Sequence, residues 1–397
     1  MPGTLEGIRV VDLTTVLMGP WAAQMMGDMG ADVIKVETPA GDISRAMGPG
    51  RNPGMAAVFM TTNRNKRSIV LDLTRDEGMQ ALRRLIATAD VFMHNFRPKV
   101  MDKFGLGYDS FKDDHPELVY CRAYGFRSDG PMADKPAYDD VIQTAAGFTD
   151  LMTLIADQPR YLPTLMADKT SSYAVLSAVL SALVNRERGG GGQEVEVPMY
   201  ETLVDFMMVE HLYGATFDPP IAQMGYERVM NTERKPYATK DGYLTVLPYT
   251  DRNWRDFFAI AGRAELIDDP VFATHVARVS NSERVYAVLG EIVATRTTAE
   301  WVAALEAANI PVMRVYTKEE LLDETQLNAT GFWHMIDHPT EGRIRLADPP
   351  VRFFKTPSSI RDLPPTLGQQ SAEILAEAGY SEAEIEALIS AGISRTA

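Results

Sequence analysis

LEGIRVVDLTTVLMGPWAAQMMGDMGADVIKVE (residues 5–37) places two apolar, strand-like runs, 8–14 and 31–37, on either side of a helical segment at 21–29. A strand, a helix and a second strand of these lengths are typical of a unit in which the helix covers a parallel sheet. The stretch therefore predicts an α/β fold.

The same alternation continues through the first half of the chain. Strand-like runs at 68–73, 90–96 and 118–126 follow, and a helix is expected over 74–89, where Thr74 and Glu77 have the spacing of a capping box. Ligands of parallel sheets bind beyond the carboxyl ends of the strands. The segments expected at those ends are TTVLMGP, ETPAGD, LTR, NFRPK and GFRSDGP.

The pattern changes near residue 212. A hairpin is expected over 237–249 with its turn at Asp241–Gly242, and another over 333–350. Two short helices separated by Gly379 end the chain. The expected organisation is a large Rossmann-like α/β domain (1–211), a linker (212–236), a small α+β domain (237–309), a return linker (310–335) and a C-terminal part that completes the large domain (336–397).

Composition narrows the classes of function. The net charge of −15 argues against broad nucleic-acid binding, and no apolar run is long enough to span a membrane. The N-terminus does not resemble a signal peptide, and the single Cys121 fits a reducing cytoplasm and a buried structural thiol. The six histidines lack metal-ligand spacing, since His334 and His338 fall in a predicted strand and turn, so no metal is expected.

Glycine motifs give no support to several common enzymes. Gly27 and Gly30 lie at the far end of the first helix, whereas a dinucleotide site needs glycines at its start. The chain has no GxxxxGK[ST] phosphate loop and no GxSxG elbow, and the glycines at 189–192 suit the end of a helix.

LMADKTSSYAVLSAVLSALVNRERGGGG (165–192) is a predicted helix with one carboxylate, Asp168, at its start. Leu176, Val179 and Leu183 fall on one face, and small residues on the others suggest a helix buried nearly all round. Aspartate is a favoured N-cap. From this segment alone Asp168 is interpreted first as a cap, and a reactive carboxylate remains the alternative.

Taken in order, several stretches resemble one family. LEGIRVVDLTTVLMGPWAAQMMGDMGADVIKVE, NRNKRSIVLDL, ADVFMHNFRPKVMDKFGLGYD and NRERGGGGQEVEVPMYETL are similar to the class III CoA-transferases, the CaiB/BaiF family. YATKDGYL, TPSSIRDLPPTLG and the final helix pair extend the resemblance to about residues 5–393.

The resemblance implies a catalytic role for Asp168, because the family's nucleophile is an aspartate just before a helix of small residues. It implies an aspartyl anhydride and an aspartyl-CoA thioester as intermediates. The positive end of the helix is expected to favour the ionised carboxylate. The resemblance also implies an interlocked homodimer, with acyl-CoA and small carboxylic acids as substrates and no prosthetic group.

The residues that match the family's CoA contacts lie in the loops at the sheet's edge. The formyl-CoA branch has glutamine and arginine where this chain has Leu17 and Thr38, so exchange between formate and oxalate is not expected. The matching positions are Leu17, Met18, Leu71, Asp72, Leu73, Thr74, Asn95, Phe96, Arg97, Lys103, Lys135 and Tyr138, with Arg75 as a neighbouring candidate.

Two other functions compete with CoA transfer. The racemase branch of the family uses a histidine in a Gly-His-Asp triplet, where this chain has Ala137, Tyr138 and Asp139. Tyrosine, with a reference pKa of about 10, is a poor base near neutral pH. A protein that only binds acyl-CoA is the second alternative.

Overall fold

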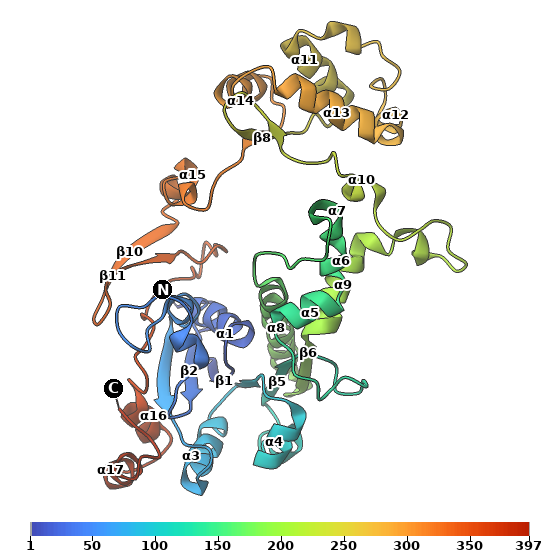
Figure 1. Cartoon of the computed structure of the whole chain (residues 1–397). Coiled ribbons are helices and arrows are strands. Elements are labelled where there is room, and N and C mark those ends of the chain that lie inside the picture. The colour runs from blue at the N-terminus through green and yellow to red at the C-terminus, as the bar shows by residue number, and fades with distance from the viewer. Residues whose placement is uncertain (1, 397) are drawn as a thin grey trace. The chain divides into compact units, whose positions relative to one another are not determined.

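The computed structural model describes residues 2–396, which form two compact units (Figure 1). The first unit contains the residues up to Met152, the segment 159–207 and the residues from Ala329 on. The second contains Thr153–Gln158 and Met208–Asn328. The chain therefore leaves the first unit, builds the second and returns.

A parallel sheet of six strands is the centre of the first unit, as the alternating pattern predicts. Its spatial order is β3-β2-β1-β4-β5-β6, the order of a doubly wound sheet. The strand order reverses between β1 and β4, so the loops that follow these two strands flank the expected ligand crevice. The strands are β1 (Arg9–Leu13), β2 (Asp32–Glu37), β3 (Lys66–Val70), β4 (Val91–His94), β5 (Val119–Tyr124) and β6 (Glu194–Pro198).

Helices connect the strands of this sheet. Cys121 lies fully buried in β5, as predicted, and burial raises the pKa of its thiol to about 12. The α-helices of the first unit that precede residue 212 are α1 (Met18–Asp28), α2 (Ala57–Thr62), α3 (Asp76–Ile86), α4 (Pro98–Phe104), α5 (Asp139–Ala145), α6 (Phe148–Leu151) and α8 (Met166–Asn185), while α9 (Met199–His211) runs from the first unit into the second.

The start of α3 corrects one expectation. The capping box of Thr74 and Glu77 does not form, because Arg75 is the residue before the helix. The Thr74 hydroxyl donates instead to Oδ1 of Asp72 at 2.6 Å. Asp72 thereby closes a local turn of the kind that competes with helix capping.

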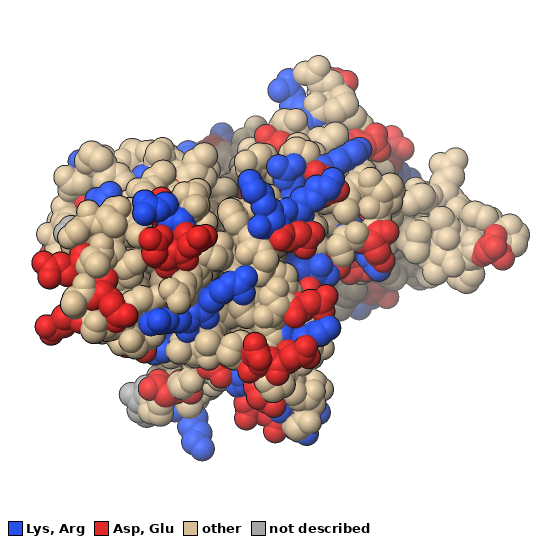
Figure 2. All heavy atoms as spheres, turned by 90° about the horizontal axis from the view of Figure 1, so that it is seen from below, with Lys and Arg blue, Asp and Glu red and all other residues tan. Residues whose placement is uncertain are grey.

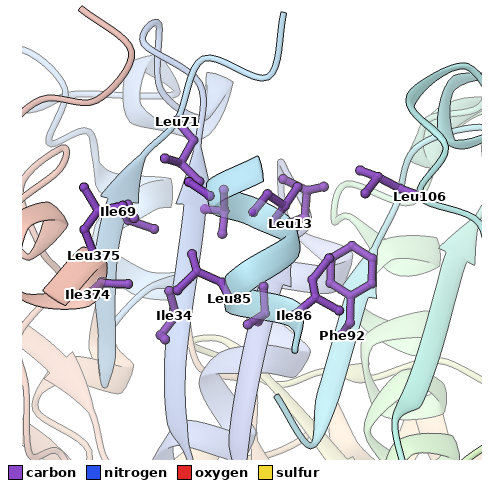
Figure 3. Packing of buried hydrophobic residues seen from close by; sticks show 14 of the residues in the cluster. Leu13, Ile34, Ile69, Leu71, Leu85, Ile86, Phe92, Leu106, Ile374 and Leu375 are labelled. Atoms are coloured by element: carbon purple, nitrogen blue, oxygen red, sulfur yellow. The ribbon is translucent and has the colours of Figure 1, made fainter. Parts of the chain in front are cut away.

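One apolar core joins the sheet to α3 and to the end of the chain (Figure 3). Leu85 and Ile86 of α3 lie against the sheet, and Ile374 and Leu375 come from the C-terminal α16 (Ser371–Glu377). Gly379, at φ +83°, separates α16 from α17 (Glu382–Ser390), as predicted. Fully burying each such side chain contributes about 1.5–3 kcal/mol.

Both predicted hairpins are present. β10 (Trp333–His338) pairs with β11 (Gly342–Ala347) in the first unit. In the second unit, β7 (Tyr237–Ala238) pairs with β8 (Tyr243–Val246), which also pairs with β9 (Val312–Arg314). The helices of the second unit are α7 (Thr153–Ala156), α10 (Glu227–Met230), α11 (Asp251–Ala261), α12 (His275–Ser280), α13 (Ser282–Val293) and α14 (Thr298–Ala307); α15 (Thr325–Ala329) ends it.

The second unit has its own aromatic core. Phe257 stacks on Trp301 with the ring centroids 5.8 Å apart, and Trp254 and Phe272 pack beside them. The unit is thus stabilised independently of the parallel sheet.

The charged residues do not form a continuous field of one sign on the face shown in Figure 2, where acidic and basic side chains are interspersed. Within residues 2–396, no helix combines the length and the apolar character needed to cross a bilayer.

Candidate active site

The loop after β1 brings the two halves of the doubly wound sheet together. The backbone N–H of Thr15 donates to Oδ1 of Asn95, which follows β4, at 3.0 Å, and Nδ2 of Asn95 donates to the carbonyl of Thr15 at 2.8 Å. Val16 has φ +73°, a left-handed conformation that is strained for a β-branched residue. The surrounding contacts therefore hold this loop in one defined shape just before α1.

A buried ionic network lies beneath this loop. Nζ of Lys35 donates to the carbonyl of Thr14 at 3.1 Å and to Oδ2 of Asp42 at 2.8 Å. Oδ1 of the same aspartate accepts the backbone N–H of Val16 at 3.1 Å. The strained loop is thus fixed by Lys35 of β2 and by Asp42, which lies beyond the end of that strand.

The network contains equal numbers of acidic and basic side chains. Nζ of Lys66 lies 2.9 Å from Oδ2 of Asp12, and Arg45 binds Glu37 through two contacts of 2.7 Å. Burial alone would raise the pKa of Asp12, but the charges of Lys66 and Lys35 outweigh burial, so the pKa of Asp12 is lowered. For Lys66 burial prevails and lowers its pKa to about 8. The members of the buried ionic network are Asp12, Lys35, Glu37, Asp42, Arg45 and Lys66.

Asp168 lies inside the first turn of α8. Leu165 is the residue before the helix and makes no side-chain cap, so the interpretation of Asp168 as the N-cap is wrong. The helix is also not buried all round, because Tyr173 and Val184 are about half exposed. α8 ends at Asn185, before the predicted stop, and a π-helical turn over Arg186–Gly190 follows, in which Gly189 has the predicted left-handed conformation at φ +85°.

Asp139 holds the first turn of α8. Its Oδ1 accepts the backbone N–H of Asp168 at 3.0 Å, and its Oδ2 accepts Nε2 of Gln143 at 2.6 Å. Gln143 in turn accepts the backbone N–H of Leu162 at 2.9 Å. Asp139 and Gln143 are buried and four residues apart, a spacing that places both on one face of α5 and that sequence reasoning missed.

The carboxyl of Asp168 is only 9% exposed and has no cation beside it. Within residues 2–396 no basic side chain forms an ion pair with Asp168 or Asp139. Burial, followed by the negative charge of Asp139, raises the pKa of Asp168 to about 7. The expectation that the helix end favours the ionised form is therefore corrected: burial and Asp139 prevail.

Ser172 links the first turns of two helices. Its Oγ lies 2.7 Å from the carbonyl oxygen of Met18, at the start of α1, and 2.8 Å from that of Asp168. The adjacent Ser171 is also fully buried, but its hydroxyl has no hydrogen-bond partner among residues 2–396. A Cβ on Gly19 would lie 2.3 Å from Cβ of Thr14, so only glycine fits at this approach.

The structure brings some of the predicted CoA contacts together. Leu17 and Met18 lie at the start of α1, and Asn95 binds the preceding loop. Phe96 is half-buried beside Asn95. Nη1 of Arg97 donates to the carbonyl of Asp134 at 3.3 Å, which places the 97 loop next to the segment of Lys135.

Other predicted contacts lie apart from this group. The segment 71–75 (Leu71, Asp72, Leu73, Thr74, Arg75) follows β3 and is tied to the end of the chain, because the backbone N–H of Asp72 donates to the carbonyl of Ile393 at 2.8 Å. The side chain of Leu71 is fully buried in the core. Lys103 is exposed on α4, and Tyr138, 69% exposed, directly precedes Asp139.

The sheet order and this group of residues agree with the comparison to known families. CoA-transferase family III matches residues 5–371. The chain belongs to this family. The family and the names of related proteins support CoA-transferase activity and acyl-CoA as a substrate.

Relatives of this family III chain cover almost its whole length. A probable fatty acyl-CoA transferase of Mycobacterium tuberculosis is 33% identical over 94% of this chain and 97% of its own. The succinate–glutarate CoA-transferase of Agrobacterium fabrum is 34% identical over 94% of this chain and 95% of its own. The succinyl-CoA:glutarate CoA-transferase of Mus musculus is 31% identical over 98% of this chain and 90% of its own.

Solved structures agree with the fold of this family III chain. The crystal structure of a CaiB/BaiF family protein from Brucella suis has a TM-score of 0.81 and 31% identity, covering 95% of this chain and 100% of that chain. The orthorhombic crystal form of Rv3272 from Mycobacterium tuberculosis gives a TM-score of 0.81 at 31% identity, over 94% and 99% of the two chains.

Proposed function

We propose that this protein moves CoA from an acyl-CoA thioester to an acceptor carboxylic acid, with Asp168 as the nucleophile. The observation that carries the proposal is a nearly buried carboxyl without a cation, whose pKa is raised to about 7, in the first turn of α8 beside the α1 loop. Strongly perturbed carboxyls in such settings are candidates for chemistry.

The first half of the reaction releases the donor acid. A carboxylate oxygen of Asp168 attacks the thioester carbonyl, the C–S bond breaks, and CoA leaves as the thiolate with the electron pair. The thiolate then attacks the aspartyl carbonyl of the mixed anhydride. The donor acid leaves as a carboxylate, and CoA is held as a thioester on Asp168.

The second half reverses these steps with the acceptor. The acceptor carboxylate attacks the aspartyl thioester and expels the CoA thiolate, which gives a second mixed anhydride. The thiolate attacks the acceptor's carbonyl, the new acyl-CoA forms, and Asp168 leaves as a carboxylate. No net proton is consumed, and no metal or redox group takes part.

The surroundings of Asp168 suit this sequence. An anhydride survives only where water is scarce, and Asp168 is nearly buried. A carboxylate with a raised pKa is more basic than an ordinary aspartate, and it is still substantially ionised near pH 7. The first turns of α1 and α8 carry N–H groups that their own helices leave without acceptors, and these can stabilise the oxyanions of both halves.

We further propose that CoA binds along the loops at the carboxyl ends of the strands, where Leu17, Met18, Asn95, Arg97 and Lys135 lie. Oriented amides and arginines at such an edge suit a phosphorylated ligand. Phe96, Lys103, Tyr138 and the segment 71–75 are the remaining candidate contacts. CoA is a substrate in this proposal, and the protein carries no prosthetic group.

The assembly and the acids are part of the same proposal. We propose an interlocked homodimer in the cytoplasm, built from a large domain (1–211 and 336–397), a small domain (237–309) and two linkers. Light scattering of the purified protein tests the dimer, and a monomer contradicts it. Because named relatives use succinate and glutarate, small dicarboxylic acids are the first acceptors to try.

A matrix of acyl-CoA donors and carboxylic acids, read by mass spectrometry, tests the function. We expect at least one pair to exchange CoA, and Asp168→Asn to abolish that exchange. Asp140→Asn is the matched control, because Asp140 is an exposed neighbour on α5. Uptake of deuterium at the α-carbon of an acyl-CoA without any acceptor would indicate a racemase instead, although Tyr138 takes the place of its histidine.

A further inference from the structure

The second unit contains a cleft that the proposed chemistry does not use. Two cavities of about 120 and 280 Å³ adjoin each other within this unit. Five residues line both cavities, and the two neighbouring cavities are here named together the small-unit cleft. Sites for small molecules usually span about 300–1,000 Å³, so the larger cavity is near the lower limit. The shared residues are Arg228, Leu247, Pro248, Trp254 and Tyr286.

The walls of the small-unit cleft are mostly apolar. Trp254, Tyr237 and Leu289 line it from the aromatic core and are nearly fully buried. Tyr249 and Val279 line the smaller cavity, and each is at least half exposed. Exposed large apolar side chains gathered at a cavity are typical of a binding site.

Basic side chains outnumber acidic ones in the lining of the small-unit cleft, where Glu227 is the acidic lining residue. Arg228 is half-buried and bonds to the hydroxyls of Tyr286 and Tyr226. Arg234 also lines the cleft, and within residues 2–396 neither arginine forms an ion pair with a carboxylate. The other two basic lining residues have acidic partners, because Lys235 is 3.2 Å from Glu233 and Arg278 is 2.5 Å from Asp251.

Arg228 and Arg234 thus bring to one cleft two guanidinium groups that form no ion pair within residues 2–396. A guanidinium presents N–H donors in a planar fork that matches a carboxylate. The resulting ion pair is stronger beside apolar surface, where less water competes for it. A ligand that satisfies both features of the cleft has an anionic end and a carbon body.

We propose that the small-unit cleft binds a carboxylic acid, with the carboxylate at Arg228 and Arg234 and the carbon chain against Trp254 and Leu247. This inference rests on the proposed function for the class of ligand, a donor or acceptor acid. It assigns the second unit the recognition of the acid.

Equilibrium binding to the full-length Asp168→Ala protein tests the proposal without turnover. Glutarate and phenylacetate are the acidic probes, phenylacetamide is the neutral probe, and tryptophan fluorescence is the signal. We expect the two acids to change the fluorescence. The amide binds at least about tenfold more weakly than the acids, because it cannot form the ion pair. Trp254→Phe removes most of the signal.

Matched arginine variants localise the binding. Arg228→Met lowers the affinity for the acids at least about tenfold, and Arg228→Lys lowers it less. Arg234→Gln lowers the affinity by an intermediate amount. Arg252→Met is the control, since Arg252 is exposed on α11 and does not line the cleft. Unchanged thermal transitions show that the variants fold.

The outcomes separate this inference from the proposed function. Acid binding that depends on Arg228 in a protein that exchanges no CoA supports the cleft and overturns the function. Exchange that proceeds in Arg228→Met with unchanged KM for every acid, and unchanged binding, overturns the cleft alone. If no acid binds and Arg228→Met instead dissociates an oligomer, the cleft is an interface between copies and the inference fails.

Discussion

Two groups of buried carboxyls in the first unit are balanced in opposite ways. In the buried ionic network, Asp12, Glu37 and Asp42 face three basic side chains within hydrogen-bonding distance. At the start of α8, Asp168 faces Asp139 and has no basic partner. Both groups are removed from water, but only the first has its charge neutralised.

The difference in charge balance separates a group with a structural role from a group suited to catalysis. Buried charges are tolerated when each has a partner, and the network holds the strained loop before α1. The Asp139–Asp168 pair lowers the stability of the folded protein, and it raises the pKa of Asp168. Both effects are expected at a site that favours reactivity over stability. The network positions the loop, and the pair contains the proposed nucleophile, Asp168.

The largest expected effect is on catalysis. Asp168→Asn replaces the nucleophile with an amide that cannot form the anhydride, so exchange falls by about four orders of magnitude or more. Steady-state rates of acyl-CoA formation measure the loss. Asp140→Asn keeps normal turnover, and an equal loss in that control would show that any charge near α5 matters.

The network gives the next largest effect, and it is on stability. Lys66→Met leaves Asp12 buried without its closest cation, so the free energy of unfolding falls by about 3–5 kcal/mol. Urea denaturation measures the change. Arg75→Met, which removes an exposed pair with Glu77, costs less than about 1 kcal/mol. Similar losses of unfolding free energy in the two variants would show that the buried ion pair contributes no more than the exposed one.

Asp168→Asn changes stability in the opposite direction. Because the pKa of Asp168 is about 7 in the folded protein and 3.8 ordinarily, the folded state holds its proton more tightly between these values. Its ionisation therefore lowers stability as the pH rises from 4 to 7. The asparagine variant gains about 2–4 kcal/mol at pH 8 and little at pH 4. Thermal denaturation at both values measures this, and no gain at pH 8 argues against a desolvated charge.

The pH dependence of activity sharpens the same point. The carboxylate is the reactive form, so kcat/KM rises about tenfold per unit below pH 7 and levels off above it. Asp139→Asn removes the negative neighbour and shifts the midpoint to lower pH. A profile whose midpoint stays in place in this variant excludes Asp139 as a cause of the shift.

The smallest effect concerns the contact between α1 and α8. Ser172→Ala removes the hydroxyl between the carbonyls of Met18 and Asp168, so kcat falls by about tenfold while KM changes little. Ser171→Ala removes a hydroxyl without a partner and leaves kcat unchanged. Equal kcat values in the two variants would remove Ser172 as a positioning residue.

Regular patterns in the sequence predicted the elements, but not their contacts. The alternation of strands and helices, both hairpins and the final helix pair follow from local periodicity. The capping roles of Asp168 and Thr74 were wrong, because Leu165 precedes one helix and Asp72 binds the threonine. Such outcomes depend on backbone angles that a residue pattern does not fix.

The ion pairs that form across the sheet could also not be predicted from the sequence. Lys35 falls in the predicted strand 31–37 and Lys66 just before the predicted strand 68–73, yet both are fully buried because Asp42 and Asp12 approach from other segments. The pair of Asp139 and Asp168 likewise joins residues 29 positions apart. Only the resemblance to CoA-transferases singled out Asp168.

Trapping the acylated enzyme with hydroxylamine tests the nucleophile most directly. Wild-type protein is incubated with an acyl-CoA donor and hydroxylamine, digested, and sequenced by tandem mass spectrometry. We expect a hydroxamate on Asp168 that requires the donor and is absent from Asp139. Continued CoA exchange with an unmodified Asp168 peptide, or with the hydroxamate on another carboxyl, would contradict the assignment.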